Sequence, residues 1–365
     1  MKSFRMNADY EMELFLGRRG SAIINESLEF LLFFLESGPV YSSKKYEKEY
    51  LDYVEQVTNR RPQLTSSGDF ENYWGPLKNI EREKWWNSKI TSTKLIIDRG
   101  WCSDTFIINT KNDLSLIDPN KTYLIKDPFG MSGQKFSVIG PKLSMSEKES
   151  IFNTFLNRGM FILEPFLKRV YDFSHYVYPN GKIIFYQNFI DQKFQYRGTY
   201  FHHLKNTKPE SLIFYSGIEK GEWSQNKAKW DEIHTFLSQH ENQSGYSVDS
   251  FVYLEDGKNK IRPMSEINYR RTMGRVAFEI AEKFSSHHHW SANLIVKNLN
   301  PKTPVWKKIN DSSLSKRSDL KVIGLSPGDT RFDMVFISGD EIVDLQQTIF
   351  ELKKLLPECE FAVDV

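Results

Sequence analysis

The chain has very few cysteines. Only two of its 365 residues are cysteine, Cys102 and Cys359, and they form neither a CxxC pair nor a metal-binding spacing. A disulfide framework needs a dense, paired set of cysteines, so this class of small secreted scaffold is excluded. Sparse cysteine is typical of a reducing compartment, and we therefore expect a cytoplasmic protein.

Long hydrophobic runs are also missing. The longest apolar run near the N-terminus covers only residues 30–35, whereas a membrane helix needs about 20 apolar residues. The first residues carry Asp and Glu where a signal peptide has an apolar core. We therefore expect neither a secretory leader nor a membrane partner.

The chain has little net charge and lacks several widespread catalytic motifs. It carries 49 basic and 47 acidic side chains, a net charge of +2, which leaves no basic footprint for a nucleic-acid partner. It has no G-x-x-x-x-G-K-[ST] phosphate loop, no G-x-S-x-G elbow and no HExxH run. A P-loop is therefore excluded as a nucleotide site, and the characteristic motifs of α/β-hydrolases and HExxH metalloproteases do not appear.

What is present is a chain long enough for two or three domains of about 100–200 residues each, in which strands and helices alternate. Residues 28–35 predict a buried strand, and residues 59–76 predict a loop. Helices are predicted over residues 42–57, over a segment ending near Gly100, and after a capping box of Ser146 and Glu149. Hairpins are predicted at residues 123–139, 172–192 and 245–268. The pattern is that of an α/β fold with much antiparallel sheet.

The stretch YLIKDPFGMSGQKF, residues 123–136, ends an apolar run in Lys126 and continues into a loop with two glycines. One interpretation is an ordinary hairpin with a solvated lysine at its mouth. The other is a lysine directed at a phosphate, with a loop whose backbone N–H groups approach the anion. The stretch alone does not decide between the two.

Three oxygen-bearing side chains stand out in the late hairpin. Glu266 and Asn268 lie two residues apart, so they point to the same face of a strand. An antiparallel partner strand would bring Asp249 beside them. Such a set suits Mg²⁺, which completes its shell with water and phosphate oxygens. The alternative is a solvated polar face of the hairpin.

The order of these features along the chain resembles the ATP-grasp superfamily. A lysine at the start of a helix precedes TKLIIDRG, Lys126 ends a strand before a glycine loop, and ILEPFL follows at residues 162–167. Asp249 and a Glu-x-Asn-x-Arg run that begins at Glu266 complete the set. The resemblance covers roughly residues 85–285. Each motif is degenerate, so the ordered set carries the resemblance.

The resemblance implies a binding site for ATP. Lys126 would neutralise the α- and β-phosphates together with Lys89, for which Lys94 is an alternative. A loop would close over the phosphates, a hinge would contact the adenine, and a carboxylate would bind the ribose hydroxyls. These roles fall on Gly130, Met131, Ser132 and Gly133 for the loop, on Glu164, Phe166 and Leu167 for the hinge, and on Asp172 for the ribose.

The resemblance also implies a metal site and a catalytic arginine. Asp249, Glu266 and Asn268 would hold one or two Mg²⁺ ions, with Mn²⁺ as an alternative, between the β- and γ-phosphates. Arg270 or Arg271 would stabilise charge on the transferring phosphoryl group or the acyl-phosphate. Arg270 is favoured because it lies two residues past Asn268.

Two further features, Ser247 and the histidines, say less about function. In several members of the superfamily an arginine stands two residues before the metal aspartate, and here that position is Ser247. This departure leaves the carboxylate substrate unspecified. His202 and His203 are expected to be polar strand or loop residues, with a position facing the substrate cleft as the alternative. Metal binding is not expected for the run His287–His289, since a run on a loop cannot direct three ligands at one ion.

The function implied is an ATP-dependent ligase that activates a carboxylate as an acyl-phosphate for attack by an amine, or less often a thiol. Small-molecule carboxylate and amine substrates would be its partners, and a homodimer is left open. The alternatives are an ATP-grasp kinase that phosphorylates a hydroxyl and a non-catalytic nucleotide-binding protein. Hydroxylamine would trap an acyl-phosphate only in the ligase.

The architecture implied is an ATP-grasp fold with an α/β domain on either side. The N-terminal α/β domain, of the type that precedes this fold, would cover residues 1–85. The small ATP-grasp subdomain would cover residues 86–165, and the large subdomain with the metal site residues 166–294. A C-terminal α/β extension would cover residues 295–365.

Overall fold

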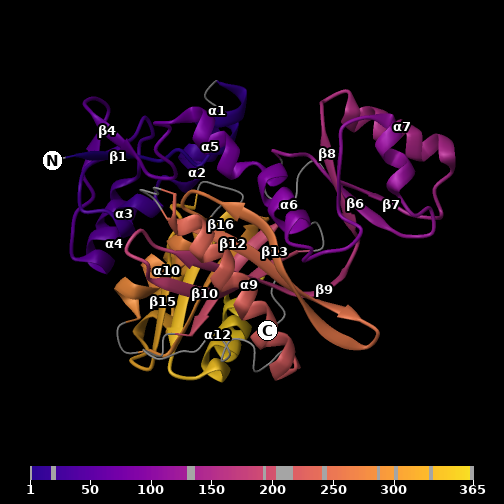
Figure 1. Ribbon diagram of the computed structural model, residues 1–365. Coiled ribbons are helices and arrows are strands. Elements are labelled where there is room, and N and C mark those ends of the chain that lie inside the picture. The colour runs from indigo at the N-terminus through magenta and orange to yellow at the C-terminus, as the bar shows by residue number, and fades with distance from the viewer. Residues whose placement is uncertain are drawn as a thin grey trace.

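The structure, a computed structural model, describes residues 2–17, 22–129, 136–191, 195–202, 217–240, 245–285, 288–299, 303–328 and 332–361. These residues form three sheets, which we name the N-terminal, small and large sheets (Figure 1). The predicted loop residues Gly130, Met131, Ser132 and Gly133, as well as His203 and His287, lie outside the described residues. No described helix is long and apolar enough to cross a membrane.

The N-terminal sheet is parallel, with strand order β3-β2-β1-β4. Its strands are β1 (Ser3–Arg5), β2 (Val40–Tyr41), β3 (Leu64–Thr65) and β4 (Phe70–Asn72). Parallel neighbours need crossover connections, and helices lie within these connections. They are α1 (Tyr10–Leu16), α2 (Ala22–Leu28), α3 (Leu31–Leu35) and α4 (Lys48–Thr58), and α5 (Ile80–Asn87) follows the sheet.

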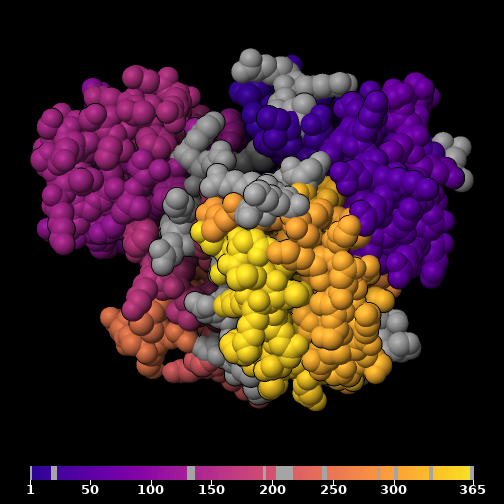
Figure 2. Space-filling view, turned by 180° about the vertical axis from the view of Figure 1, so that it is seen from behind, coloured from indigo at the N-terminus to yellow at the C-terminus, as the bar shows by residue number. Residues whose placement is uncertain are grey.

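The small sheet is antiparallel, with strand order β5-β8-β6-β7. Its strands are β5 (Phe106–Ile108), β6 (Tyr123–Lys126), β7 (Phe136–Ile139) and β8 (Phe161–Pro165). The helices of this part are α6 (Lys89–Asp98), the short 3₁₀ helix η1 (Lys111–Leu116) and α7 (Met145–Leu156). Figure 2, seen from behind, shows this unit in magenta on one side and the N-terminal unit in indigo to violet on the other, with the C-terminal residues in orange and yellow below them.

The large sheet is antiparallel throughout, with strand order β13-β12-β9-β10-β11-β14-β16-β15 and β17 paired to β14. Its strands are β9 (Lys168–Val177), β10 (Ile183–Ile190), β11 (Tyr196–His202), β12 (Tyr246–Glu255), β13 (Lys258–Asn268), β14 (Trp290–Asn298), β15 (Leu320–Gly324), β16 (Phe332–Gly339) and β17 (Cys359–Phe361). Its helices are α9 (Lys220–Ser238), α10 (Met273–Phe284), α11 (Val305–Asp311), the 3₁₀ helix η2 (Leu314–Lys316) and α12 (Ile342–Leu355).

Helices cover both faces of the large sheet. On one face α10 packs together with α3 of the N-terminal unit, so the two units share one apolar core. On the other face α9 covers β12 and β13, and α12 covers β14 and β16. This packing fixes the N-terminal unit against the strands that carry the predicted site.

One strand prediction is wrong. Residues 28–35 are not a strand but the end of α2 and the whole of α3. Every residue from Leu31 to Leu35 is buried, because α3 lies between α4, α10 and the core of the N-terminal unit. A short run that is apolar on every side has no periodicity, so the sequence pattern cannot separate a buried helix from a buried strand.

Other boundaries move by a few residues. The capping box of α7 is formed by Ser144 and Glu147, two residues before the predicted pair. The segment 59–76 contains the short strands β3 and β4. The proposed domain limit after residue 165 coincides with the end of β8, but the limit after residue 294 falls inside β14. The C-terminal strands therefore extend the large sheet and do not form a sheet of their own.

Candidate active site

A cavity of about 360 Å³ opens where the three units meet. Its size falls in the usual range of ligand sites, about 300–1,000 Å³. The N-terminal unit contributes Ala8, Glu11, Ile24, Leu28 and Trp74; the small unit contributes Lys89, Lys126 and Asp127; the large sheet and the segment after it contribute Arg169, Asp172, Ser174, Asp249, Glu266, Asn268, Arg270 and Met273. Seven of the predicted residues therefore line one cavity: Lys89, Lys126, Asp172, Asp249, Glu266, Asn268 and Arg270.

The hairpin β12–β13 brings its three predicted metal ligands together, as expected. Asp249 pairs with Glu266 across the ladder, and Ser247 pairs with Asn268. The register is set by a tight turn at Asp256 and Gly257, whose φ angles of 49° and 76° suit a two-residue hairpin loop. The three side chains therefore share one face.

A break in the ladder lies directly beside these residues. The pairing shifts between Asp249 and Phe251, and Pro263 lies in the irregular part of β13. Proline has no N–H for the ladder, so a bulge is where a strand tolerates it. The Pro263 carbonyl instead accepts hydrogen bonds from Ser250 Oγ at 2.7 Å and Trp230 Nε1 at 2.7 Å. Bulges of this kind often redirect side chains next to active sites.

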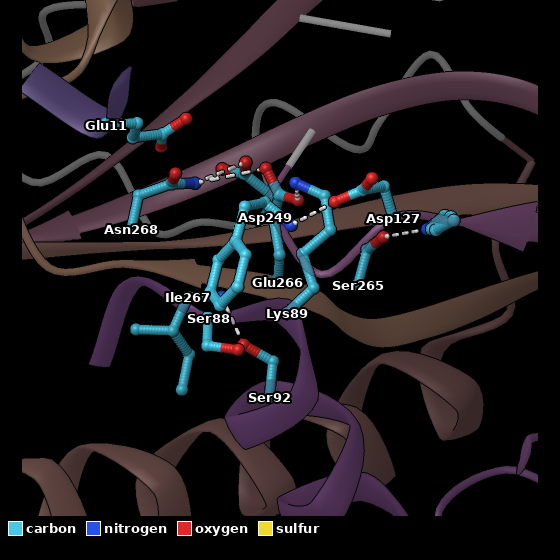
Figure 3. A network of polar contacts seen from close by, with 12 residues as sticks. Glu11, Ser88, Lys89, Ser92, Asp127, Asp249, Ser265, Glu266, Ile267 and Asn268 are labelled. Carbon is cyan, nitrogen blue, oxygen red and sulfur yellow. Dashed lines mark hydrogen bonds and ion pairs between the residues drawn. The ribbon is translucent and has the colours of Figure 1, made fainter. Parts of the chain in front are cut away.

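Asp249 is held by neutral donors. Its carboxylate accepts hydrogen bonds from Ser174 Oγ at 2.7 Å and from Ser247 Oγ at 3.0 Å. Asn268 Nδ2 also donates to it, at 2.8 Å (Figure 3). Burial and the neighbouring charge of Glu266 raise the pKa of Asp249 to about 6, against the effect of these donors. The site thus holds a carboxylate that is easily protonated unless a cation neutralises it.

Glu266 is held by a cation. Lys89 Nζ lies 2.6 Å from Glu266 Oε2, and Ser88 caps the helix that begins at Lys89. Burial alone would raise the pKa of Glu266, but the charge of Lys89 lowers it to about 2. Of the two lysines considered, Lys89 lines the cavity, whereas Lys94 Nζ lies 5.7 Å above the ring of Trp85.

Lys126 lies at the cavity end of β6. Its ammonium forms an ion pair with Glu164 and donates to Ser265 Oγ at 3.4 Å. Arg262 Nη2 lies 3.9 Å from the other oxygen of Glu164. Glu164 therefore lies between two cations and does not depend on Lys126 alone.

The predicted adenine hinge is placed differently from the lysines. Glu164, Phe166 and Leu167 are not among the described residues that line the cavity. The side chain of Glu164 is directed at Lys126, and the Phe166 N–H donates to the Thr122 carbonyl at 2.9 Å. Contact between adenine and this segment stays a prediction.

Asp172 lines the cavity from the middle of the large sheet. Arg169 Nη1 donates to Asp172 Oδ1 at 2.5 Å. Burial raises the pKa of Asp172, while the nearby arginine opposes the rise. The contact of Asp172 with ribose hydroxyls stays a prediction, because the hydrogen bond from Arg169 does not test it.

The two neighbouring arginines point to different cavities. Arg270 lines the main cavity and binds Glu11 of α1 through Nε, at 2.9 Å, and Nη2. Arg271 lines a second cavity of about 720 Å³ at the edge of the N-terminal sheet. There its guanidinium stacks on Tyr73, 4.0 Å from the ring centroid, and lies 3.7 Å from Glu36. The geometry therefore places Arg270, the arginine favoured from the sequence, at the main cavity and Arg271 at the second one.

Several residues of the site were not predicted. Ser247, noted as a departure from the superfamily pattern, binds Asp249 directly. Ser174 donates to Asp249 and accepts from Asn188 Nδ2 at 2.7 Å. Ser247 shares a face with Asp249 two residues on, a signal that the sequence contained. Glu11 gave none, because it is 259 residues from its partner Arg270.

Three of the five histidines considered, His202, His288 and His289, belong to the described residues. The ring of His202 packs 3.9 Å from the ring of Trp290, and His288 Nδ1 lies 2.7 Å from Ser338 Oγ. Among the described residues, neither these two nor His289 lines the main cavity. The described residues also contain no group of three or more His, Cys, Asp or Glu side chains placed to hold a metal.

The hairpin set is nevertheless compatible with Mg²⁺. Asp249 and Glu266 supply two carboxylates, and Asn268 supplies an amide whose nitrogen now donates to both, at 2.8 Å and 3.4 Å. An amide turned by half a turn offers its oxygen to the same point. Two carboxylates and one amide are a partial oxygen shell, which suits an ion that keeps waters and phosphate oxygens.

The chain has the ATP-grasp fold, and this confirms the fold implied by the order of its motifs. The structure matches N5-carboxyaminoimidazole ribonucleotide synthetase from Thermus thermophilus with a TM-score of 0.50 and 14% identity, over 98% of this chain and 93% of that one. It matches biotin carboxylase from Campylobacter jejuni, in a β,γ-ATP complex, with a TM-score of 0.50 and 10% identity, over 99% and 92%. No protein-family model and no curated protein matches the sequence.

Proposed function

We propose that the protein is a Mg²⁺- and ATP-dependent ligase that activates a carboxylate as an acyl-phosphate and transfers the acyl group to an amine. The main support is one cavity that combines two lysines, Lys89 and Lys126, with the oxygen donors Asp249, Glu266 and Asn268. The lysines supply the positive charge that a polyphosphate needs, and the oxygen donors supply the ligands that a hard divalent cation needs. The ATP-grasp fold agrees with this assignment.

The lysines bind and orient the phosphates. Lys126 exchanges its contact with Glu164 for phosphate oxygens, and Glu164 keeps the neighbouring guanidinium of Arg262 at 3.9 Å. Lys89 turns from Glu266 to the phosphates in the same way. Each exchange replaces one charged partner by another, so neither lysine is left buried and unpaired.

The hairpin acids hold the cation. Asp249, Glu266 and Asn268 would bind Mg²⁺, which supplies charge neutralisation at the phosphate oxygens. Ser174 and Ser247 orient Asp249 through hydrogen bonds of 2.7 Å and 3.0 Å. These hydroxyls support the ionised form of the carboxylate, which burial and Glu266 otherwise disfavour.

The reaction proceeds in two steps. A carboxylate oxygen of the substrate attacks the γ-phosphorus, and the bond to the bridging oxygen breaks with its electron pair left on ADP. The amine nitrogen then attacks the acyl carbon, phosphate leaves, and the nitrogen loses a proton. Arg270 neutralises charge on the acyl-phosphate. The loop Gly130–Gly133 is expected to keep water from the intermediate.

A trapping experiment tests the function. The protein is incubated with ATP, Mg²⁺ and a panel of carboxylic acids, and ADP release is measured with and without hydroxylamine. A ligase forms the hydroxamate of its carboxylate substrate. A kinase releases ADP with a hydroxyl substrate and forms no hydroxamate, and a non-catalytic binder releases none; either outcome refutes the proposal. Asp249→Asn serves as the inactive control.

A further inference from the structure

The cavity has a wall of different chemistry on the side of the N-terminal unit. This wall, which we call the N-terminal wall, consists of Ala8, Glu11, Ile24, Leu28 and Trp74. Figure 3 shows Glu11 at one end of the polar network and Asp127 at the other. Four of the five side chains are apolar, so the group that contacts this wall has a largely apolar surface.

The one charged side chain of the N-terminal wall is Glu11, and it is only half used. Both hydrogen bonds from Arg270 end on its Oε1 atom. Among the described residues, no donor contacts Oε2. The Glu11 side chain is only 10% exposed, it lines the cavity, and Oε2 is not among the fully buried oxygens that lack a partner, so Oε2 can be reached from the cavity. Oε2 is therefore a place for a ligand donor.

Arg270 also keeps part of its bonding capacity. A guanidinium has five N–H groups, of which Nε and Nη2 each donate one to Glu11 and Nη1 donates one to the Arg271 carbonyl at 3.1 Å. Two N–H groups, one on each terminal nitrogen, thus have no partner among the described residues. They match the two oxygens of a carboxylate, which arginine binds in pairs.

We propose that the carboxylate substrate is an α-amino acid with an apolar side chain. Its ammonium group binds Glu11 Oε2, its carboxylate binds the two remaining N–H groups of Arg270, and its side chain contacts Ile24, Leu28 and Trp74. The charges of the ligand complete those of the ion pair, and its apolar part matches the rest of the N-terminal wall. This inference rests on the proposed ligase function and names its substrate class.

The orientation assigns the amino acid to the first step of the reaction. Arg270 follows Asn268 by two residues, and Asn268 contacts Asp249 and Glu266, so the bound carboxylate lies beside the predicted metal site. That carboxylate attacks the γ-phosphorus, and ADP leaves. The ammonium on Glu11 stays protonated and cannot act as the nucleophile. A second molecule therefore supplies the amine, which displaces phosphate and loses one proton.

Paired ligands test the contact with Glu11. Calorimetry, with Mg²⁺ and a non-hydrolysable ATP analogue present, measures the affinity for leucine and for 4-methylpentanoate, which lacks only the amino group. Glu11→Gln is expected to weaken leucine binding by about 10- to 100-fold, the range for a charged hydrogen bond, and to change 4-methylpentanoate binding far less. Glu13→Gln is the control, since Glu13 lies on the same helix and pairs with Arg5 at 3.7 Å.

The outcomes separate the inference from the function on which it rests. Equal losses for both ligands in Glu11→Gln would show that Glu11 only positions Arg270, and would overturn the inference. Binding of the ATP analogue without binding of leucine, phenylalanine or methionine would also overturn it, while the ligase proposal would stand. Failure to bind the analogue at all would refute the ligase proposal itself.

A second variant tests the apolar part of the inference independently of Glu11. Leu28→Phe places a larger side chain on the N-terminal wall and reduces the space for the side chain of the ligand. The affinity for leucine and phenylalanine is therefore expected to fall at least tenfold relative to the affinity for alanine. Glutamate and lysine are expected to bind the unaltered protein more weakly than leucine. The reverse preference, for a charged side chain over an apolar one, would overturn the assignment.

Discussion

The two faces of the large sheet hold ionisable groups under opposite conditions. On the cavity face of β9 and β12, Ser174 and Asp249 belong to a network in which charged groups have polar partners. On the α9 face of β9, His175 is fully buried against Trp230 and His234. Neither of its ring nitrogens has a hydrogen-bond partner among the described residues.

The two groups differ in how burial is tolerated. The ionised form of Asp249 is disfavoured, since burial and the like charge of Glu266 raise its pKa to about 6. His175 carries no buried charge, because burial and the adjacent His234 lower its pKa well below the usual value and keep the ring neutral. We therefore expect changes on the cavity face to alter activity and changes on the α9 face to alter stability.

The largest effect is expected from removing a charge on the cavity face. Asp249→Asn should lower ATP turnover by about 10³-fold, because a ligand for the cation is lost. The same change should raise the melting temperature at pH 7.5 in EDTA, since it removes the repulsion with Glu266. ADP release and thermal unfolding measure the two effects.

The control for this variant lies on the same hairpin. Glu255→Gln changes an exposed acid beside the turn, opposite Lys258, and should leave turnover and melting temperature within experimental error of the unaltered protein. An Asp249→Asn protein that turns over ATP normally would show that the cavity face holds no catalytic cation.

The local parts of this face could be predicted from sequence. Alternation along a strand places Glu266 and Asn268 together, and an Asp-Gly turn sets the register that adds Asp249. A strand that ends in a lysine before glycines made Lys126 a candidate, and the order of the motifs along the chain then favoured it as a phosphate ligand. These inferences need only period and turn chemistry, which neighbouring residues encode.

The parts that join distant segments could not be predicted in the same way. Glu11 meets Arg270 only because α10 packs against the N-terminal unit. The contact of Lys126 with Glu164 depends on the pairing of β6 with β8. The segment 28–35 was assigned to the wrong element because burial on every side erases periodicity.

The next largest effect, on ATP binding, is expected from removing the charge of Lys126. Lys126→Met should weaken ATP binding by about 10- to 100-fold, since one charged contact to phosphate is lost. Folding should be retained, because Glu164 keeps Arg262 at 3.9 Å. Lys121→Met is the control, as Lys121 is exposed and pairs with Asp104 at 2.7 Å. Equal ATP affinity in both variants would contradict the role of Lys126.

A smaller contrast separates the neighbouring arginines. Arg270→Lys should lower turnover by about 10-fold or more, because lysine cannot bind a carboxylate with two parallel N–H groups. Arg271→Lys should leave turnover within about threefold and instead lower stability, since the stacking on Tyr73 at 4.0 Å is lost. Steady-state kinetics and thermal unfolding of the two variants make the comparison. The opposite pattern would place the catalytic arginine at the second cavity.

The smallest effect is expected on the α9 face. The pKa of His175 is lower in the folded protein than its ordinary value of 6.5, so the unfolded chain binds the additional proton. The penalty that His175 places on folding is therefore absent above about pH 6.5, and it lowers the free energy of unfolding as the pH drops below that value.

His175→Phe should remove about 1 kcal/mol of this pH-dependent loss of stability between pH 7.5 and 5.5, measured by urea unfolding, with ATP turnover unchanged. His289→Gln, at an exposed histidine, is the control variant. A change in turnover with His175→Phe would show that the two faces of the sheet are not independent, since Ser174, its neighbour in β9, would then transmit the substitution to Asp249.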